Sequence, residues 1–82
     1  MKRAVAIKYD ATHPAPFIVA KERGLLADRL LAIAEEYGIE TIRDETLLDS
    51  LFFVETGSYI PESLFEAVAA MLAYIYRTRS SV

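Results

Sequence analysis

The residues best suited to chemistry in this 82-residue chain are its single histidine, His13, and the carboxylate three positions earlier, Asp10. A hydrolase would use such a pair as a general base and its orienting acid, beside a nucleophile. His13 precedes Pro14 in a loop, where a histidine without a catalytic role is the common case. A metal site would need further ligands at defined spacing, and none accompanies His13. We therefore predict no catalytic residue, no metal and no cofactor.

The other reactive residue types offer no alternative site. The chain contains no cysteine, which excludes disulfides and thiolate metal ligands. Its three glycines are not spaced to cradle a phosphate. Neighbours in sequence do not face each other on a helix, so solvated helix faces account for the two carboxylate pairs, Glu35–Glu36 and Asp44–Glu45. An enzyme around His13 and Asp10 ranks below every binding hypothesis.

Charge and hydropathy exclude two classes of partner. The net charge is −3 and the nine lysines and arginines are spread along the chain, unlike the basic patch of a nucleic-acid-binding protein. No apolar run approaches the roughly 18–20 residues that cross a bilayer. We therefore expect a cytoplasmic protein without direct membrane insertion. The apolar fraction of 54% leaves some apolar surface exposed on so small a body, and such patches usually bind other molecules.

The strands that would position these residues follow from the apolar pattern. Alternating apolar side chains predict a strand over residues 3–9. Short apolar runs predict two further strands over residues 17–20 and 39–42. Residues 10–16 contain two prolines and are predicted to form a loop between the first two strands.

Three helices are predicted from the remaining periodicity. The first carries an inward stripe of Leu26, Leu30, Ile33, Ala34 and Tyr37 and ends at Gly38, a residue that favours the left-handed conformation. A short helix over residues 45–52 follows Asp44 as its N-cap. The last helix covers about residues 61–77, with Pro61 in its first turn.

The expected fold is α/β. A small mixed sheet of about three strands, in the order β-β-α-β-α-α, is packed by three helices. At this length the chain is predicted to form a single domain over residues 1–82. Its ends, residues 1–3 and 78–82, are predicted to be flexible.

The last predicted helix carries two apolar stripes. One consists of Leu64, Val68, Met71, Leu72 and Ile75, and the adjacent one of Phe65, Ala69, Leu72 and Tyr76. An arc this wide is more than one sheet face usually needs. The second stripe either reaches the core through a neighbouring helix or forms part of a partner-binding surface, and the periodicity leaves both interpretations open.

Several short segments, taken in order and spacing, resemble one protein family. They are Ala4–Asp10, Ala15-Pro16, Val19-Ala20-Lys21, Tyr37-Gly38-Ile39, Ile60–Phe65, Ala67–Ala69 and Leu72–Arg77. Together they resemble the cytoplasmic C-terminal domain of the FlhB/YscU (EscU/HrcU) family, the export-switch proteins of flagellar and type III secretion systems. The resemblance covers residues 4 to about 77 and implies the fold of that domain.

Two features of the family are missing from this sequence. Family members carry a transmembrane part before this domain, and an Asn-Pro-Thr-His motif where the asparagine side chain attacks its own carbonyl carbon and cleaves the chain. This chain contains no asparagine, and Thr12-His13-Pro14 has the wrong place and order to replace the motif. The sequence therefore resembles a stand-alone version of the post-cleavage fragment, and we predict that it does not cleave itself.

The resemblance implies a non-enzymatic role in protein export. The implied partners are export-apparatus proteins, export substrates and the full-length membrane switch protein, with recruitment to the inner-membrane export apparatus. It also implies a shallow apolar pocket for a short hydrophobic motif of early export substrates, and the matching positions are Ala15, Pro16, Ala69 and Leu72. The alternative is a generic small regulatory interaction module that has the same fold but no secretion role.

The family sheet also includes a strand from upstream of the cleavage motif, and that strand is missing here. The resemblance therefore implies an exposed strand edge at Val5, Ala6, Ile7, Lys8 and Tyr9. Such an edge presents unpaired N–H and C=O groups to a partner strand, or to a second copy in weak self-association.

Overall fold

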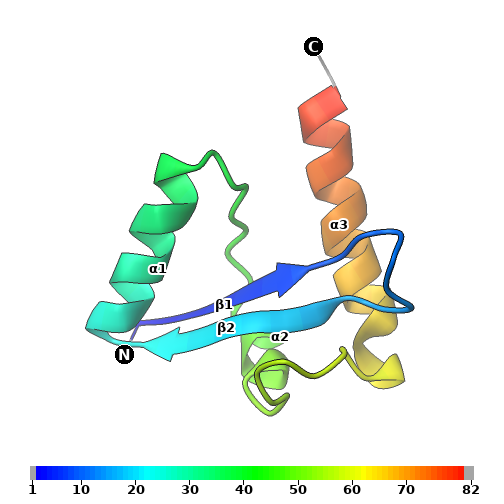
Figure 1. Cartoon of the computed structure of the whole chain (residues 1–82), viewed down its shortest axis with the longest axis horizontal. Coiled ribbons are helices and arrows are strands. Elements are labelled where there is room, and N and C mark those ends of the chain that lie inside the picture. Colours follow the sequence, from blue (N-terminus) through cyan, green and yellow to red (C-terminus); the bar gives the residue numbers. More distant parts are fainter. Residues whose placement is uncertain (1, 81–82) are drawn as a thin grey trace.

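The first two predicted strands pair as an antiparallel hairpin. In the computed structural model, which describes residues 2–80 and the side chains of residues 2–77, β1 spans Arg3–Lys8 and β2 spans Phe17–Arg23 (Figure 1). β2 extends beyond its predicted end because residues 21–23 pair with the first half of β1. The register shifts between Ala6 and Ile7, which is a β-bulge that increases local twist.

The helices begin and end close to their predicted positions. They are α1 (Leu25–Glu36), α2 (Glu45–Leu51), the 3-10 turn η1 (Glu62–Leu64) and α3 (Phe65–Ser80). The Asp44 carboxylate accepts a hydrogen bond from the Leu47 backbone N–H at 3.0 Å, which confirms it as the N-cap of α2. Gly38 adopts a φ of +68° just after α1, as predicted. Pro61 precedes η1, so the long helix starts later than expected.

The prediction of a third strand over residues 39–42 is wrong. These residues are part of the irregular connection from α1 to α2, and the sheet of the described residues contains only β1 and β2. The outer edge of β2 is occupied instead by residues 57–60. The backbone of Ile18 exchanges two hydrogen bonds with residues 57 and 58, of 2.7 and 3.0 Å, and Tyr59 forms a bridge with Phe17. Residues 57–60 lack the apolar alternation that marks a strand, so the sequence pattern missed them.

The core lies between one face of the hairpin, α2 and α3. Its buried side chains are Ile18, Leu47, Leu51, Ile60 and Val68, and the partly buried Val5, Ile7, Val54, Leu64, Met71 and Leu72 pack against them. The two largest fully buried side chains are Ile18 from β2 and Val68 from α3. This shared core fixes α3 against the start of β2, where the site described below lies.

α1 packs on the hairpin through a face that is shifted from the predicted stripe and shares only Leu30 and Ala34 with it. Ala27 is fully buried, and its half-buried neighbours are Leu30, Leu31 and Ala34. Three side chains of the predicted inward stripe are instead 53%, 44% and 74% exposed: Leu26, Ile33 and Tyr37. A two-stranded sheet is narrower than the expected three-stranded one, so it covers a narrower stripe of α1.

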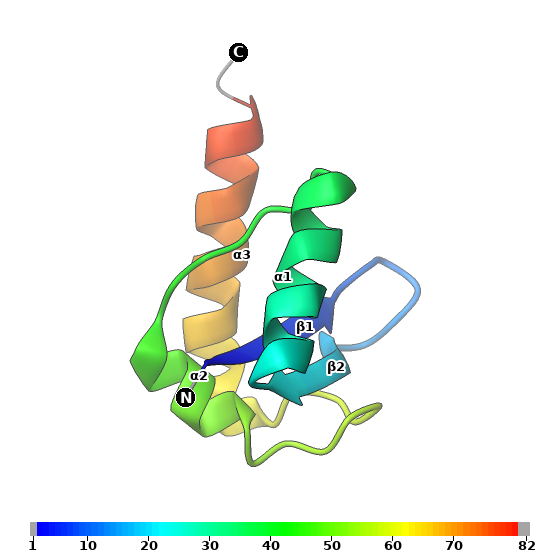
Figure 2. The same ribbon diagram turned by 90° about the vertical axis from the view of Figure 1, so that its left-hand side faces the viewer.

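The two long helices stand at opposite ends of the hairpin. Figures 1 and 2 show α1 near the end where β2 finishes and α3 near the end where β2 begins, with α2 below the strands. Of the chain ends expected to be flexible, Arg3 belongs to β1 and residues 78–80 continue α3. Residue 1 and residues 81–82 lie outside the described part of the chain.

Candidate protein-binding site

The four predicted pocket residues line one pocket. Ala15 and Pro16 come from the hairpin loop, and Ala69 and Leu72 come from α3. Tyr9, Pro14 and Phe65 complete the lining of this cavity, which measures about 220 Å³ and is mainly apolar. The sequence pattern missed these three as lining residues, although Phe65 shares the second stripe with Ala69 and Tyr9 ends the predicted strand.

One wall of the pocket is the second apolar stripe of α3. Phe65, Ala69 and Leu72 are spaced i, i+4, i+7, so they share a helix face. Phe65 is 41% exposed, Ala69 is exposed and Leu72 is half-buried, whereas Val68 on the adjacent face is buried in the core. A helix packed over this stripe would bury it. The stripe therefore lines the open pocket through Phe65 and Ala69, while Leu72 lines the pocket and also packs against the core.

The opposite wall is the loop between β1 and β2, which a carboxylate holds in shape. Asp10 Oδ1 accepts hydrogen bonds from the Thr12 backbone N–H at 2.9 Å, from the Thr12 hydroxyl, and from His13 Nδ1 at 2.7 Å. The hydrogen bonds from the Thr12 hydroxyl and from His13 hold the pKa of the Asp10 carboxyl well below its ordinary value. The loop is thereby closed at its start.

Three aromatic rings in mutual contact hold the other end of the loop. The His13 ring lies 4.8 Å from the Phe17 ring and 6.4 Å from the Tyr59 ring, and the Phe17 and Tyr59 centroids are 6.3 Å apart. Such tilted and edge-on contacts stabilise aromatic pairs by about 0.5–1.5 kcal/mol each. The Ile60 backbone N–H also donates to the Pro16 carbonyl at 2.8 Å. These contacts set the position of the pocket wall formed by residues 14–16.

The geometry of His13 does not form a catalytic relay. Thr12 Oγ1 lies 3.0 Å from His13 Nδ1, the same ring nitrogen that contacts Asp10. A nucleophile, base and acid in relay need the two ring nitrogens to face different partners. Within the described residues, no group of three or more His, Cys, Asp or Glu side chains is arranged to hold a metal ion. The loop contacts of His13 are structural.

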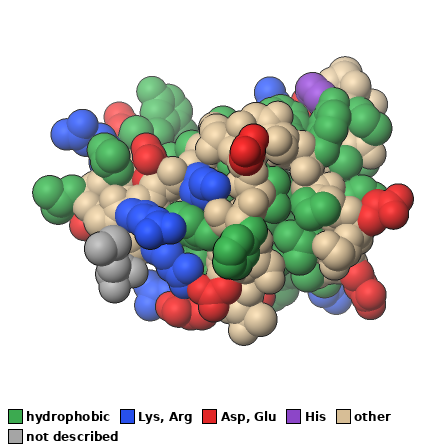
Figure 3. All heavy atoms as spheres, turned by 90° about the horizontal axis from the view of Figure 1, so that it is seen from below, with side chains coloured by type: hydrophobic (Ala, Val, Ile, Leu, Met, Phe, Trp, Pro, Cys, Tyr) green, Lys and Arg blue, Asp and Glu red, His purple; other side chains and the backbone are tan. Residues whose placement is uncertain are grey.

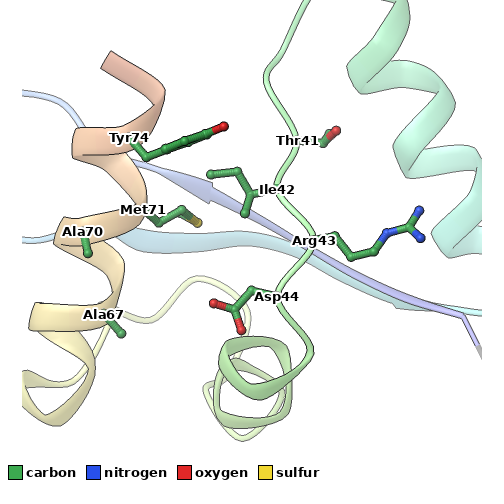
Figure 4. Close-up of a pocket in the computed structure, with 8 residues that line it drawn as sticks. All are labelled: Thr41, Ile42, Arg43, Asp44, Ala67, Ala70, Met71 and Tyr74. Carbon is green, nitrogen blue, oxygen red and sulfur yellow. The ribbon is translucent and has the colours of Figure 1, made fainter. Parts of the chain in front are cut away.

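A second and larger cavity, of about 510 Å³, lies on another side of α3 (Figure 4). Its lining residues are Thr41, Ile42, Arg43, Asp44, Ala67, Ala70, Met71 and Tyr74. In Figure 4, Met71 and Tyr74 of α3 and Ile42 of the extended connection point toward one another. The sequence does not predict this cavity, because its pattern favours a strand over residues 39–42.

The predicted strand edge adjoins the first pocket. Val5 and Ile7 pack against the core, Ala4 is buried, and Lys8 and Tyr9 are exposed. Within residues 2–80, no backbone hydrogen bond outside the pairing with β2 involves residues 4–8. Tyr9, which follows β1, is also a lining residue of the pocket. The edge and the pocket therefore meet at one residue.

Comparison with known proteins identifies the family. The sequence model described as the FlhB HrpN YscU SpaS Family matches residues 1–75. The chain belongs to this family. It is 47% identical over 73 residues to the flagellar biosynthetic protein FlhB of Helicobacter pylori, an alignment that covers 88% of this chain and 20% of that protein. The chain thus spans about a fifth of the length of this FlhB relative.

A relative of similar length also aligns. The protein YlqH of Bacillus subtilis is 32% identical over 83 residues, which cover all of this chain and 89% of that protein. The crystal structure of the PscU C-terminal domain superposes with a TM-score of 0.85 at 32% identity, and covers 89% of this chain and 95% of that one. The fold is thus that of the cytoplasmic export-switch domain of flagellar and type III secretion systems. No helix within the described residues has the length and apolarity to span a bilayer.

Proposed function

We propose that this chain is a non-enzymatic interaction domain of flagellar or type III protein export. It binds export substrates through the pocket, or substitutes for the C-terminal fragment of the membrane-anchored switch protein at the inner-membrane export apparatus. The observation that supports this proposal most directly is the pocket itself, in which Ala15 and Pro16 of the hairpin loop face Ala69 and Leu72 of α3.

The chemistry of the pocket favours a short hydrophobic segment as its occupant. Its lining is mainly apolar, and the small side chain of Ala69 leaves room for a guest side chain. Full burial of one Leu, Ile or Phe side chain contributes only about 1.5–3 kcal/mol. Binding through this pocket alone is therefore weak and readily reversed, as expected for a site that must release each substrate to the export channel.

The unpaired edge of β1 supplies a second contact in this proposal. This edge presents backbone N–H and C=O groups to a strand of the full-length switch protein, of another apparatus protein or of a second copy.

The pocket is tested with two substitutions and a matched control on the same helix. Ala69→Glu and Leu72→Glu place a carboxylate in the pocket, and Ala73→Glu places the same charge on an exposed position that lines neither cavity. Pull-downs of early flagellar substrates and of the export gate should lose the first two variants and retain the third. Circular dichroism checks that all three are folded. Equal capture of all three folded variants would remove the site assignment.

A further inference from the structure

Three cationic side chains surround one aromatic ring at the end of the hairpin away from the pocket. The guanidinium carbons of Arg3 and Arg23 lie 5.2 and 5.1 Å from the centroid of the Phe52 ring, and the Lys21 ammonium lies 5.9 Å from it. Figure 3, seen from below, shows Lys and Arg side chains gathered on the side of the molecule where β1 starts. We call these four residues the cation cluster.

The three cations of the cluster differ in what neutralises them. Arg3 pairs with the carboxylate of Asp49. Lys21 donates two hydrogen bonds of 2.9 Å to backbone carbonyls that follow α2, so its position is fixed. Arg23 is exposed, and within the described part of the chain no carboxylate lies at ion-pair distance from it. The cluster therefore carries excess positive charge on a chain whose net charge is −3.

The strand register places two cations of the cluster opposite each other. Arg3 and Arg23 are direct partners in the strand register, and like charges opposite each other in a sheet are unfavourable. The face of the Phe52 ring attracts both cations and offsets part of this repulsion. Contact with the ring also restricts the guanidinium planes before any ligand arrives, which lowers the entropy lost when they bind a carboxylate.

We propose that the cation cluster binds acidic side chains of an extended segment of a partner protein. A guanidinium accepts a carboxylate through two parallel hydrogen bonds, and Arg23 is accessible for this geometry. Phe53, the residue after the ring, is 90% exposed and offers an apolar contact to such a segment. The proposal goes beyond the proposed function, because the cluster lies at the opposite end of the hairpin from the pocket.

The surroundings of the cluster favour a short acidic segment over a polyanionic surface. Two exposed carboxylates, those of Asp28 and Asp49, lie in ion pairs with Lys2 and Arg3. They repel the closely spaced charges of a nucleic acid or an anionic membrane, as does the net charge of the chain. A flexible peptide can place single carboxylates on Arg23 and avoid them.

The test uses an octapeptide with two glutamates among glycines and serines as the probe, and the same peptide with lysines in place of the glutamates as the control for charge. In NMR titrations of the isotope-labelled full chain, the glutamate peptide should shift the signals of Arg3, Arg23 and Phe52. Arg23→Gln should weaken this binding about fivefold, since a charge-assisted contact is lost. Arg29→Gln, which removes an exposed arginine from α1, should leave it unchanged. The backbone spectrum of each variant reports that it is folded.

Two results would overturn the proposal. The first is equal binding of the glutamate peptide to Arg23→Gln and Arg29→Gln, or no binding to the original chain. The second is sedimentation of the chain with phosphatidylserine vesicles that Arg23→Gln abolishes, because that outcome assigns the cluster to a membrane. Neither result bears on the pocket, whose variants alter α3 alone.

Discussion

The carboxylate of Asp10 and the imidazole of His13 lie 2.7 Å apart within the loop that forms one wall of the pocket. The pair has the residue types of a catalytic dyad, but the contacts of Thr12 with both groups make it a loop closure. Its effect on the pocket is therefore positional, and its consequences are expected in stability and not in turnover.

Acid is expected to weaken this loop closure. The pKa of Asp10 is lower in the folded chain than in the unfolded one, so its hydrogen bonds contribute stability that is present above the unfolded pKa of about 4. That contribution is lost as the pH falls below about 4 toward the folded pKa. Urea unfolding of the original chain and of Asp10→Asn should show the largest stability difference near neutral pH and a smaller one near pH 3. A difference that stays constant over this range would contradict the assignment.

Core truncation and surface truncation of the same residue type are expected to differ widely. Leu51 is 4% exposed within the core, and Leu51→Ala should lower the free energy of unfolding by about 2–5 kcal/mol. Leu25 is 86% exposed, and Leu25→Ala should change it by less than about 0.5 kcal/mol. Chemical denaturation monitored by circular dichroism measures both. Similar decreases in the free energy of unfolding for the two variants would contradict the assignment of Leu51 to the core.

The N-cap of α2 gives a prediction with a built-in rescue. Asp44→Ala removes the acceptor of the Leu47 N–H and should destabilise the chain by about 0.5–2 kcal/mol. Asp44→Asn keeps a side-chain oxygen at the same place and should restore most of that loss. Thermal unfolding of the three proteins at neutral pH distinguishes the cap from a purely electrostatic effect, under which asparagine and alanine would behave alike.

The sequence predicted those features that depend on local chemistry. The capping role of Asp44 and the left-handed conformation of Gly38 follow from the residue types themselves. The grouping of Ala15 with Ala69 came from the family resemblance, because no periodicity relates two segments so far apart in the chain. The family resemblance therefore supplied information that local sequence patterns lack, namely which distant segments lie close together in the fold.

The errors arose where tertiary pairing decides the outcome. Residues 39–42 have a strand-like composition but no strand pairs with them, whereas residues 57–60 gain their extended form from β2. The cation cluster depends on the strand register that places Arg3 opposite Arg23 and on the packing that brings Phe52 beneath them. Neither the register nor the helix contact is visible in one sequence.

The two walls of the pocket come from the hairpin and from α3, which are held together by the core that contains Ile18 and Val68. The pocket therefore exists only when the hairpin and the last helix are docked, and a nascent or partly unfolded copy has none. By mass action, any occupant shifts the equilibrium of such a small domain toward its native state. A bound segment therefore also stabilises the folded state, and an excess of the segment should protect the whole domain from proteolysis.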